Sequence, residues 1–428
     1  MGPGTVTVSV DTTGLPAGVH TGTVSITDPS AYNSPQGVSV TLTIYRSNAT
    51  SAPFGTFSTP VDGSTVQSSI PVTGWVLDDI QVERVEIYRD EGVYIGDALF
   101  VDGARPDVEA AYPGYPFNYR AGWGYMLLTN FLPNGGNGTF TIYARAADRE
   151  GNVVTLGTKT ITCDNANAVN PFGAVDTPTQ GGTVSGSDYK NIGWVLTPPP
   201  NEIPGDGSTI WVFVDGIRLG NPVYNIYRKD IARLFPGYAN SDGANGYFNL
   251  DTTTYANGVH IIYWTAEDNA GNTDGIGSRY FTIQNPAGSM GQGTAEGQGE
   301  RLSQFEMMLR EQENPRAVLR GTPRRGGPVD VIKGFKRAAN PRRCYPDENG
   351  DITVNTRELE RLEIHFPGPV SNISPLPIGS TLDREKGIFY WAAGPGFVGE
   401  YWFHFGAKGP NGESKTNRIK IVIQPKFK

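Results

Sequence analysis

The chain has 428 residues and a formal net charge of −8, and at about 150 residues per domain its length suits roughly three domains. The negative charge disfavours a general nucleic-acid-binding protein, which needs concentrated cationic surface. The sequence has no apolar run of about 18 residues, so no transmembrane segment is predicted. High contents of glycine (55) and proline (32), with runs rich in Thr, Val and Tyr, predict an all-β fold with many tight turns.

The first segment, residues 1–46, is too short to form a complete β-sandwich, which takes about seven strands. A Gly-Leu-Pro-Ala-Gly turn at 14–18 and a Pro-Gln-Gly at 35–37 separate its strand-like runs. These motifs resemble the C-terminal half of BACON-type bacterial β-sandwich modules. The resemblance implies that the chain begins inside a domain and that a secretion signal would lie upstream. Period-two alternation predicts strands at 5–10, 21–27 and 38–45.

A domain-sized unit then occurs twice, at residues 53–164 (repeat one) and 171–285 (repeat two). The string Gly-Trp-Val-Leu that contains Trp75 recurs around Trp194. A strand that ends in Asp148 or Asp268 is followed in each copy by a Gly-Asn turn, which is typical of a tight hairpin. These features resemble the bacterial Ig-like domains of extracellular multidomain proteins. The resemblance implies two Ig-like sandwiches in series, and we expect Trp75 and Trp194 to occupy equivalent buried positions.

Residues 286–340 differ in composition from both repeats. A segment rich in Gly, Ser and Gln precedes a predicted helix at 302–312, whose apolar residues fall on one stripe. A basic tract follows, and we predict that residues 286–340 form a flexible linker. The tract is either a solvated connector or a docking site for an acidic polysaccharide or for the acidic face of another copy. The candidate residues for such anionic partners are Arg324, Arg325, Lys336 and Arg337.

Strand patterns return in residues 341–428. A Leu-Pro-Ile-Gly turn at 376–379, a Leu-Asp pair, an aromatic strand that ends in Trp391 and a Gly-Glu-Tyr strand occur in order. This series resembles the cadherin-like Ig modules of bacterial surface proteins and implies a further sandwich. The expected strands are 352–354, 362–366, 388–391, 400–405 and 419–423.

The sequence offers no catalytic constellation. The four histidines do not show zinc-site spacing, and we find neither a nucleophile elbow nor a phosphate-binding loop. Cys163 and Cys344 are too few to define a disulfide framework. The sequence therefore predicts a protein that is not an enzyme and needs no organic cofactor.

Calcium is a candidate cofactor because carboxylates gather beside predicted turns. Asp148 and Asp268 each precede a Gly-Asn turn, and Asp78 and Asp79 lie at another predicted loop. Oxygen ligands of this kind suit a hard cation. The alternative is that each Asp caps its own turn by accepting backbone N–H groups.

Aromatic residues in repeat one suggest a glycan-binding surface. Aligning Trp123-Gly124-Tyr125 with Asn245-Gly246-Tyr247 places Trp123 where repeat two has an amide. Aromatic residues that the repeats do not share are candidates for stacking on sugar rings, although packing in the core is the alternative. These glycan-binding candidates are Phe117, Tyr119 and Trp123.

Together these features predict a non-catalytic structural or adhesive protein of the cell surface or the extracellular space. Its expected partners are a cell-surface or matrix glycan, another protein, or a second copy of the chain. The alternative function is a carbohydrate-binding accessory region of a larger secreted enzyme. An Ig-like fold by itself does not decide between them, because such folds carry many functions.

Overall fold

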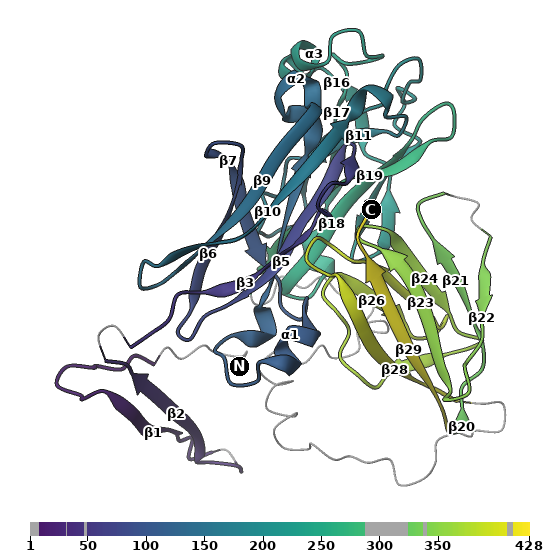
Figure 1. Cartoon of the computed structure of the whole chain (residues 1–428). Coiled ribbons are helices and arrows are strands. Elements are labelled where there is room, and N and C mark those ends of the chain that lie inside the picture. The colour runs from purple at the N-terminus through teal and green to yellow at the C-terminus, as the bar shows by residue number, and fades with distance from the viewer. Residues whose placement is uncertain (1–7, 31, 47–48, 287–323, 337–339, 409–413) are drawn as a thin grey trace.

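The structure is a computed structural model that describes residues 8–30, 32–46, 49–286, 324–336, 340–408 and 414–428 (Figure 1). These residues form one β-hairpin and three β-sandwiches, and their helices are short. The prediction of an all-β protein with Ig-like sandwiches is therefore confirmed. None of the described helices has the length and apolar character needed to cross a membrane. The helix predicted at 302–312 lies outside the described residues.

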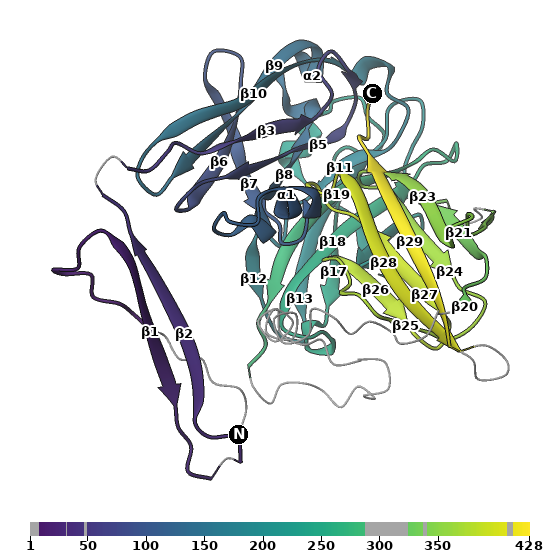
Figure 2. The ribbon, with the colours of Figure 1, turned by 60° about the horizontal axis from the view of Figure 1, so that its bottom comes forward.

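The N-terminal segment is an isolated hairpin of β1 (Gly18–Ile26) and β2 (Gln36–Ile44). Residues 8–10 are not in a strand, and residues 5–7 lie outside the described range. No described residue between 8 and 46 is buried. The hairpin has no core of its own, as expected for too few strands, and it lies beside the sandwiches (Figure 2). A single hairpin is common to many folds, so the BACON resemblance stays a prediction.

Repeat one is a sandwich whose two layers are joined by one strand. The strand order is β3-β5-β8-β7-β6-β9-β10-β4, in which β7 pairs with both β8 and β6. Its strands are β3 (Phe54–Thr59), β4 (Thr65–Val66), β5 (Ser69–Leu77), β6 (Val82–Arg89), β7 (Val93–Phe100), β8 (Gly122–Leu128), β9 (Asn137–Asp148) and β10 (Val153–Asp164). Its helical turns are α1 (Pro106–Ala111), η1 (Asn118–Arg120), η2 (Thr129–Phe131), α2 (Pro133–Gly136) and η3 (Asn165–Asn167).

Repeat two has two separate sheets, ordered β11-β13-β17-β16 and β12-β19-β18-β14-β15. The first sheet contains β11 (Phe172–Val175), β13 (Tyr189–Leu196), β16 (Val223–Ile226) and β17 (Asn245–Leu250). The second contains β12 (Gly182–Val184), β14 (Ile210–Val214), β15 (Ile217–Gly220), β18 (Gly258–Glu267) and β19 (Thr273–Ile283). Helix α3 (Lys229–Leu234) and the turn η4 (Thr252–Thr254) lie between strands.

The C-terminal sandwich contains all five strands expected from the sequence. One sheet has β20 (Arg324–Arg325), β23 (Asp351–Arg357), β25 (Val370–Asn372), β28 (Gly399–Lys408) and β29 (Ser414–Gln424). The other has β21 (Val329–Lys333), β22 (Arg342–Cys344), β24 (Arg361–His365), β26 (Ser380–Asp383) and β27 (Ile388–Ala392). These sheets show an all-β unit, and its cadherin-like assignment stays a prediction.

The structure corrects the predicted boundary of this sandwich at residue 341. Strand β21 lies inside the predicted linker, yet it pairs with β24 and β22. Val329 and Val331 on β21 are buried in the core, whereas Asp330 between them is partly exposed. This alternation is the ordinary pattern of a half-buried strand, and the surrounding basic residues concealed it in the sequence.

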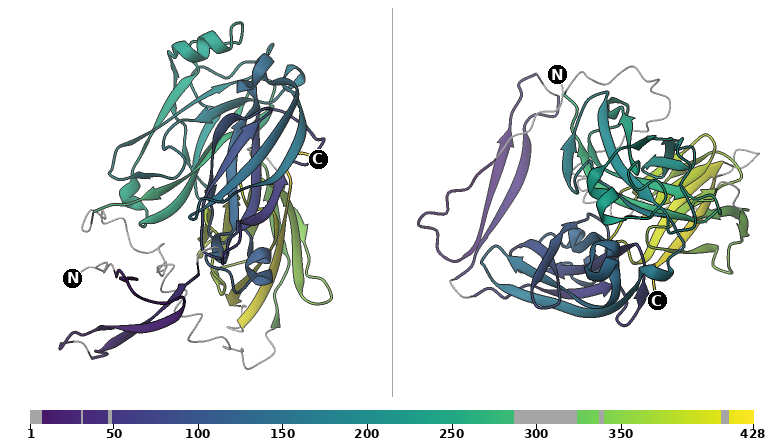
Figure 3. Two further views of the ribbon diagram at one scale, coloured as in Figure 1. Left: turned by 60° about the vertical axis from the view of Figure 1, so that its left-hand side comes forward. Right: turned by 90° about the horizontal axis from the view of Figure 1, so that it is seen from above.

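The three sandwiches pack against one another (Figure 3), and one hydrophobic cluster is shared among them. Val101 of repeat one and Ile261 of repeat two are buried in the same cluster as Phe397 of the C-terminal sandwich. The Tyr280 hydroxyl donates to the carbonyl of Pro395 at 3.1 Å, and the Tyr401 hydroxyl donates to that of Ala104. The sequence predicts β-sandwiches in series along the chain. The structure shows that the three sandwiches also pack together into one body.

Trp75 and Trp194 occupy equivalent strand positions but differ in burial. Trp194 is 1% exposed, whereas Trp75 is only half-buried, which corrects the expectation that both are buried. The Phe131 ring of repeat one lies 5.9 Å from the Trp194 ring and helps to cover it. Burial of Trp194 therefore depends partly on contact between the repeats.

Candidate functional site

The structure corrects the assignment of Trp123 to a glycan-binding surface. Its side chain is fully buried in the core of repeat one, where the ring centroid lies 5.8 Å from that of Phe57. A β-carbon on Gly74, which pairs with Trp123 across β5 and β8, would come within 2.4 Å of the indole. Gly74 thus leaves room for Trp123, and the indole belongs to a close-packed core.

A one-residue shift in the alignment of the repeats explains this error. The sequence alignment placed Trp123 opposite Asn245, but the strand pairing makes Trp123 equivalent to Gly246. A shift of one residue moves a strand side chain to the other face of its sheet. In repeat two, the space beside Gly193 is filled by Trp264 from the other sheet, which would lie 3.3 Å from a β-carbon at that position. Each repeat therefore has a buried core tryptophan, supplied by a different strand.

Phe117 and Tyr119 do lie on the surface of repeat one. They are 44% and 41% exposed, and their ring centroids are 6.4 Å apart. Their planes are inclined by 57°, so the two rings do not form one flat platform for a sugar ring. Their glycan-binding role stays a prediction.

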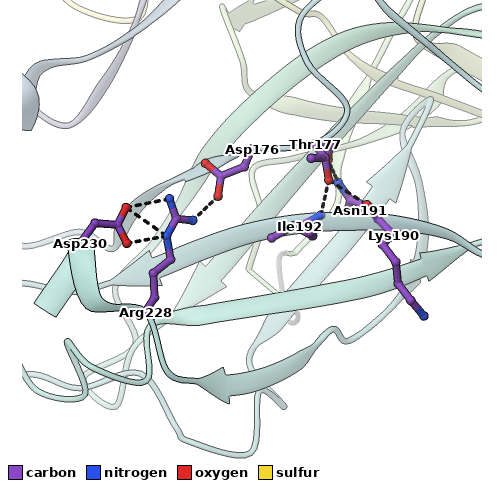
Figure 4. Close-up of polar contacts among 7 residues, drawn as sticks. All are labelled: Asp176, Thr177, Lys190, Asn191, Ile192, Arg228 and Asp230. Atoms are coloured by element: carbon purple, nitrogen blue, oxygen red, sulfur yellow. Dashed lines mark hydrogen bonds and ion pairs between the residues drawn. The ribbon is translucent and has the colours of Figure 1, made fainter.

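A matching Arg–Asp pair holds the helical loop of each repeat. In repeat one, Arg105 Nε lies 2.9 Å from Asp107 Oδ1 at the start of α1. In repeat two, Arg228 Nε lies 3.0 Å from Asp230 Oδ1 at the start of α3, and Arg228 also pairs with Asp176 after β11 (Figure 4). The carboxylates lie in the first helical turn, where the helix dipole favours negative charge. These ion pairs position the loops.

Asp268, one of the two calcium candidates, is satisfied by protein hydrogen bonds. Its Oδ1 accepts the backbone N–H groups of Ala270 and Asn272 at 3.0 and 2.9 Å. Its Oδ2 accepts from the side chains of Thr197 and Asn201 at 2.9 and 3.1 Å. Burial opposes the charge, but hydrogen bonds from Asn272 and Thr197 hold the pKa of Asp268 below its usual range. Asp268 is a turn cap, which corrects its assignment as a calcium ligand.

Asp148 caps the equivalent turn of repeat one. Its Oδ1 accepts the N–H groups of Glu150 and Asn152 at 2.9 and 2.8 Å, and its Oδ2 accepts the Asn152 side-chain amide at 2.8 Å. Repeat one has Asp78 at the position of Thr197. Burial and the negative charges of Asp79 and Asp148 raise the pKa of Asp78. In repeat two, hydrogen-bond donors stabilise the Asp268 carboxylate. In repeat one, the equivalent carboxylate of Asp148 lies near Asp78, and the two negative charges repel each other.

The four basic candidates do not form one described patch. Arg324 and Arg325 make up β20, which pairs in parallel with β29. Arg337 lies outside the described residues. Lys336 is exposed and lines a groove between repeat two and the C-terminal sandwich. Of these residues, Lys336 is therefore placed at a candidate binding site.

This groove has a volume of about 550 Å³, within the range of ligand sites in proteins. Strands β14, β15 and β18 of repeat two form one side, and β21, β24 and β27 of the C-terminal sandwich form the other. The Oγ1 of Thr209 at its edge is buried and makes no hydrogen bond among the described residues. The aromatic and charged lining residues are Trp211, Phe213, Arg218, Glu267, Phe335, Lys336, Arg361, Glu363 and Tyr390.

Two arginines stack on aromatic rings in the groove. Arg218 Cζ lies 4.3 Å from the Trp211 ring centroid, and Arg361 Cζ lies 5.7 Å from that of Tyr390. Arg361 also pairs with Glu363. Burial opposes the Glu363 charge, but Arg361 and the nearby His365 hold the pKa of Glu363 below its usual range. Because Arg361 balances that carboxylate, the charged residues that remain in the lining are the cations Arg218 and Lys336 and the carboxylate of Glu267, which leaves the groove with a small positive excess.

Sequence reasoning missed this groove because its two walls come from different domains. Trp211 is separated from Tyr390 by most of repeat two and by the segment that precedes β20. A motif search along the chain detects neighbours in sequence, and no local pattern connects these residues. The excess of basic residues around Lys336 was the one sequence pattern that pointed to this groove.

Comparison with known proteins supports the Ig-like fold. Residues 53–117 match the family described as bacterial Ig domain. A search of curated proteins finds no match.

Similar solved structures have low sequence identity and low TM-scores. The fibronectin(III)-like modules of Clostridium thermocellum CbhA share 13% identity, with a TM-score of 0.18, over 54% of this chain and 95% of theirs. The Bacteroides ovatus protein SGBP-B, solved with a mixed-linkage heptasaccharide, shares 8%, with a TM-score of 0.19, over 87% and 70%. Sidekick-1 immunoglobulin domains 1–4 share 10%, with a TM-score of 0.22, over 95% and 90%. These values carry no inference about the ligand.

Proposed function

We propose that this protein is a non-catalytic adhesive protein of the cell surface or extracellular space, and that it binds an acidic glycan in the groove between repeat two and the C-terminal sandwich. The observation that carries the proposal is the pairing of a guanidinium with an aromatic ring at Arg218 and Trp211. A guanidinium in this position can donate two hydrogen bonds to a carboxylate or sulfate group. The adjacent rings offer apolar faces to a sugar.

The packing of the sandwiches supports a binding role. Arg361 Nε on β24 donates to the Gly216 carbonyl of repeat two at 3.3 Å, and Thr381 donates to the Asp215 carbonyl at 2.9 Å. These contacts hold both walls of the groove in one orientation, which reduces the entropy cost of binding. The BACON-type and cadherin-like assignments of the two ends accord with an exported protein and belong to the same proposal.

Binding of the full chain to a glycan array tests this proposal. We expect retention on carboxylated or sulfated glycans and no release of new reducing ends during incubation. Arg218→Ala should lower the affinity at least tenfold, because Arg218 is exposed and its loss should leave the fold intact. Arg233→Ala also removes an exposed arginine, which lies on α3 outside the groove, and should bind as the parent does. Equal binding by both variants, or binding to no glycan, would refute the glycan site.

The carbohydrate-binding accessory region of a secreted enzyme remains the second candidate, and the same groove supports it. The two functions differ in whether a catalytic domain is attached to this chain. If the intact gene product also cleaves the glycan that the groove retains, the accessory role is correct. If it binds the glycan and leaves it intact, the adhesive role is correct.

A further inference from the structure

Four carboxyl groups gather where the N-terminal hairpin joins repeat one. Asp78 and Asp79 follow β5, Asp148 ends β9, and Glu150 lies in the turn between β9 and β10. One carboxylate oxygen from each of Asp78, Asp79 and Glu150 lies within 4.8 Å of the other two. Among the described residues, no lysine or arginine forms an ion pair with any of the four.

The carboxylates are left partly without hydrogen-bond donors. Asp78 is 2% exposed, and its Oδ2 accepts the N–H groups of Ile80 and Gln81 at 2.8 Å each. Its Oδ1 is buried and has no partner among the described residues, and the same is true of Asp79 Oδ1. An unpaired buried carboxylate oxygen costs free energy, so a ligand that supplies positive charge would be strongly favoured here.

Repeat two serves as an internal comparison because it lacks all three of the acidic groups Asp78, Asp79 and Glu150. Asp78 corresponds to Thr197, Asp79 to Pro198, and Glu150 to Ala270. Thr197 donates a hydrogen bond to the turn carboxylate, which is thereby satisfied without any ion. The acidic cluster is thus a feature of repeat one alone and is not required by the shared turn.

We propose that Asp78, Asp79 and Glu150 form a calcium-binding site. Calcium binds oxygen ligands at about 2.3–2.6 Å, so two ligand atoms on opposite sides of the ion can lie up to about 5 Å apart. The three carboxylate oxygens lie within 4.8 Å of one another, which fits this limit. Zinc is disfavoured because it prefers nitrogen and sulfur ligands, and magnesium demands shorter contacts in a stricter octahedron. Asp148 remains the turn cap and adds negative charge at the edge of the site.

The site also contacts the connection to the hairpin. The Ser51 N–H donates to Asp79 Oδ2 at 2.8 Å, and Thr50 Oγ1 donates to Glu150 Oε1 at 2.5 Å. The Tyr45 hydroxyl at the end of the hairpin donates to the Asp79 carbonyl at 3.2 Å. Calcium would therefore fix the hairpin relative to repeat one, since two of its ligands already hold that connection.

Calorimetric titration of the full chain with CaCl₂ tests the site. We expect one site with a dissociation constant of about 10⁻⁴–10⁻³ M, the range of extracellular modules, and at least tenfold weaker binding in Glu150→Gln and in Asp79→Asn. Glu91→Gln removes an exposed carboxylate of repeat one outside the cluster and should bind calcium as the parent does. MgCl₂ should not compete at equal concentration.

Thermal unfolding provides a second readout that does not depend on measurable binding heat. In EDTA, Glu150→Gln should unfold at a higher temperature than the parent, because the substitution removes like-charge repulsion. With 10 mM CaCl₂, about ten times the weakest expected dissociation constant, the parent should gain stability and Glu150→Gln should not. A parent whose unfolding temperature does not respond to calcium, or a calcium response that Glu150→Gln retains in full, would overturn the proposal.

Discussion

A single buried carboxyl group should make the stability of this protein depend on pH. Glu358 lies between β23 and β24, is 1% exposed, and reaches into the interface with repeat one. The hydroxyl groups of Thr59 and Thr73 donate to its Oε1 at 3.4 and 3.5 Å. Burial raises the pKa of Glu358 to about 8, from an ordinary value of 4.5.

The direction of the pH effect follows from proton binding. Between pH 4.5 and about 8, the folded protein retains a proton that the unfolded chain releases. The contribution of Glu358 to stability should therefore be full below pH 4.5 and should fall by up to about 1.4 kcal/mol per pH unit until about pH 8. The pKa difference corresponds to a total loss of about 3–5 kcal/mol.

Glu358→Gln isolates this contribution because glutamine keeps the shape and stays neutral. Urea unfolding of parent and variant from pH 5 to pH 9 should show similar free energies at pH 5 and a clear advantage for the variant at pH 8. Glu348→Gln, which removes an exposed carboxylate from the same sandwich, should keep the pH slope of the parent. Parallel pH profiles for the parent and Glu358→Gln would refute the burial of an ionisable group at this interface.

Other predictions concern the cores and the interfaces. Trp123→Ala should cost about 3–5 kcal/mol in urea unfolding, as expected for a core tryptophan, and half-buried Trp75→Ala should cost less; the reverse order would contradict the register assigned to β8. Amide exchange in residues 329–333 should be as slow as in β24, because β21 is paired on both sides; rapid exchange there would restore the linker interpretation. Tyr401→Phe, which loses a hydrogen bond to repeat one, should cost about 1 kcal/mol, and an unchanged free energy of unfolding would argue against that contact.

Patterns that act over a few residues predicted much of the fold. The strand-like runs of residues 341–428, with the turns between them, located all five expected strands of the C-terminal sandwich. The Asp-x-x-Gly-Asn turns identified the hairpins after Asp148 and Asp268, because a short carboxylate that accepts turn N–H groups is a local interaction. The repeated Gly-Trp-Val-Leu string correctly related β5 to β13.

Features that depend on register or on contacts between domains were not predictable in the same way. The one-residue shift at Trp123 changed a core residue into a surface candidate, since neighbouring strand residues face opposite sides. Val329 and Val331 were hidden by the basic residues around them. The groove beside Trp211 exists only because two sandwiches pack together, and no local pattern encodes that packing.

The most direct test of the proposed function compares the two candidate glycan surfaces in one binding assay. An acidic glycan selected on the array would be titrated into the parent, into Trp211→Ala in the groove, and into the double variant Phe117→Ala and Tyr119→Ala on repeat one. The groove account predicts that Trp211→Ala loses at least tenfold in affinity while the double variant binds as the parent does. Loss of binding in the double variant with full binding by Trp211→Ala would contradict it.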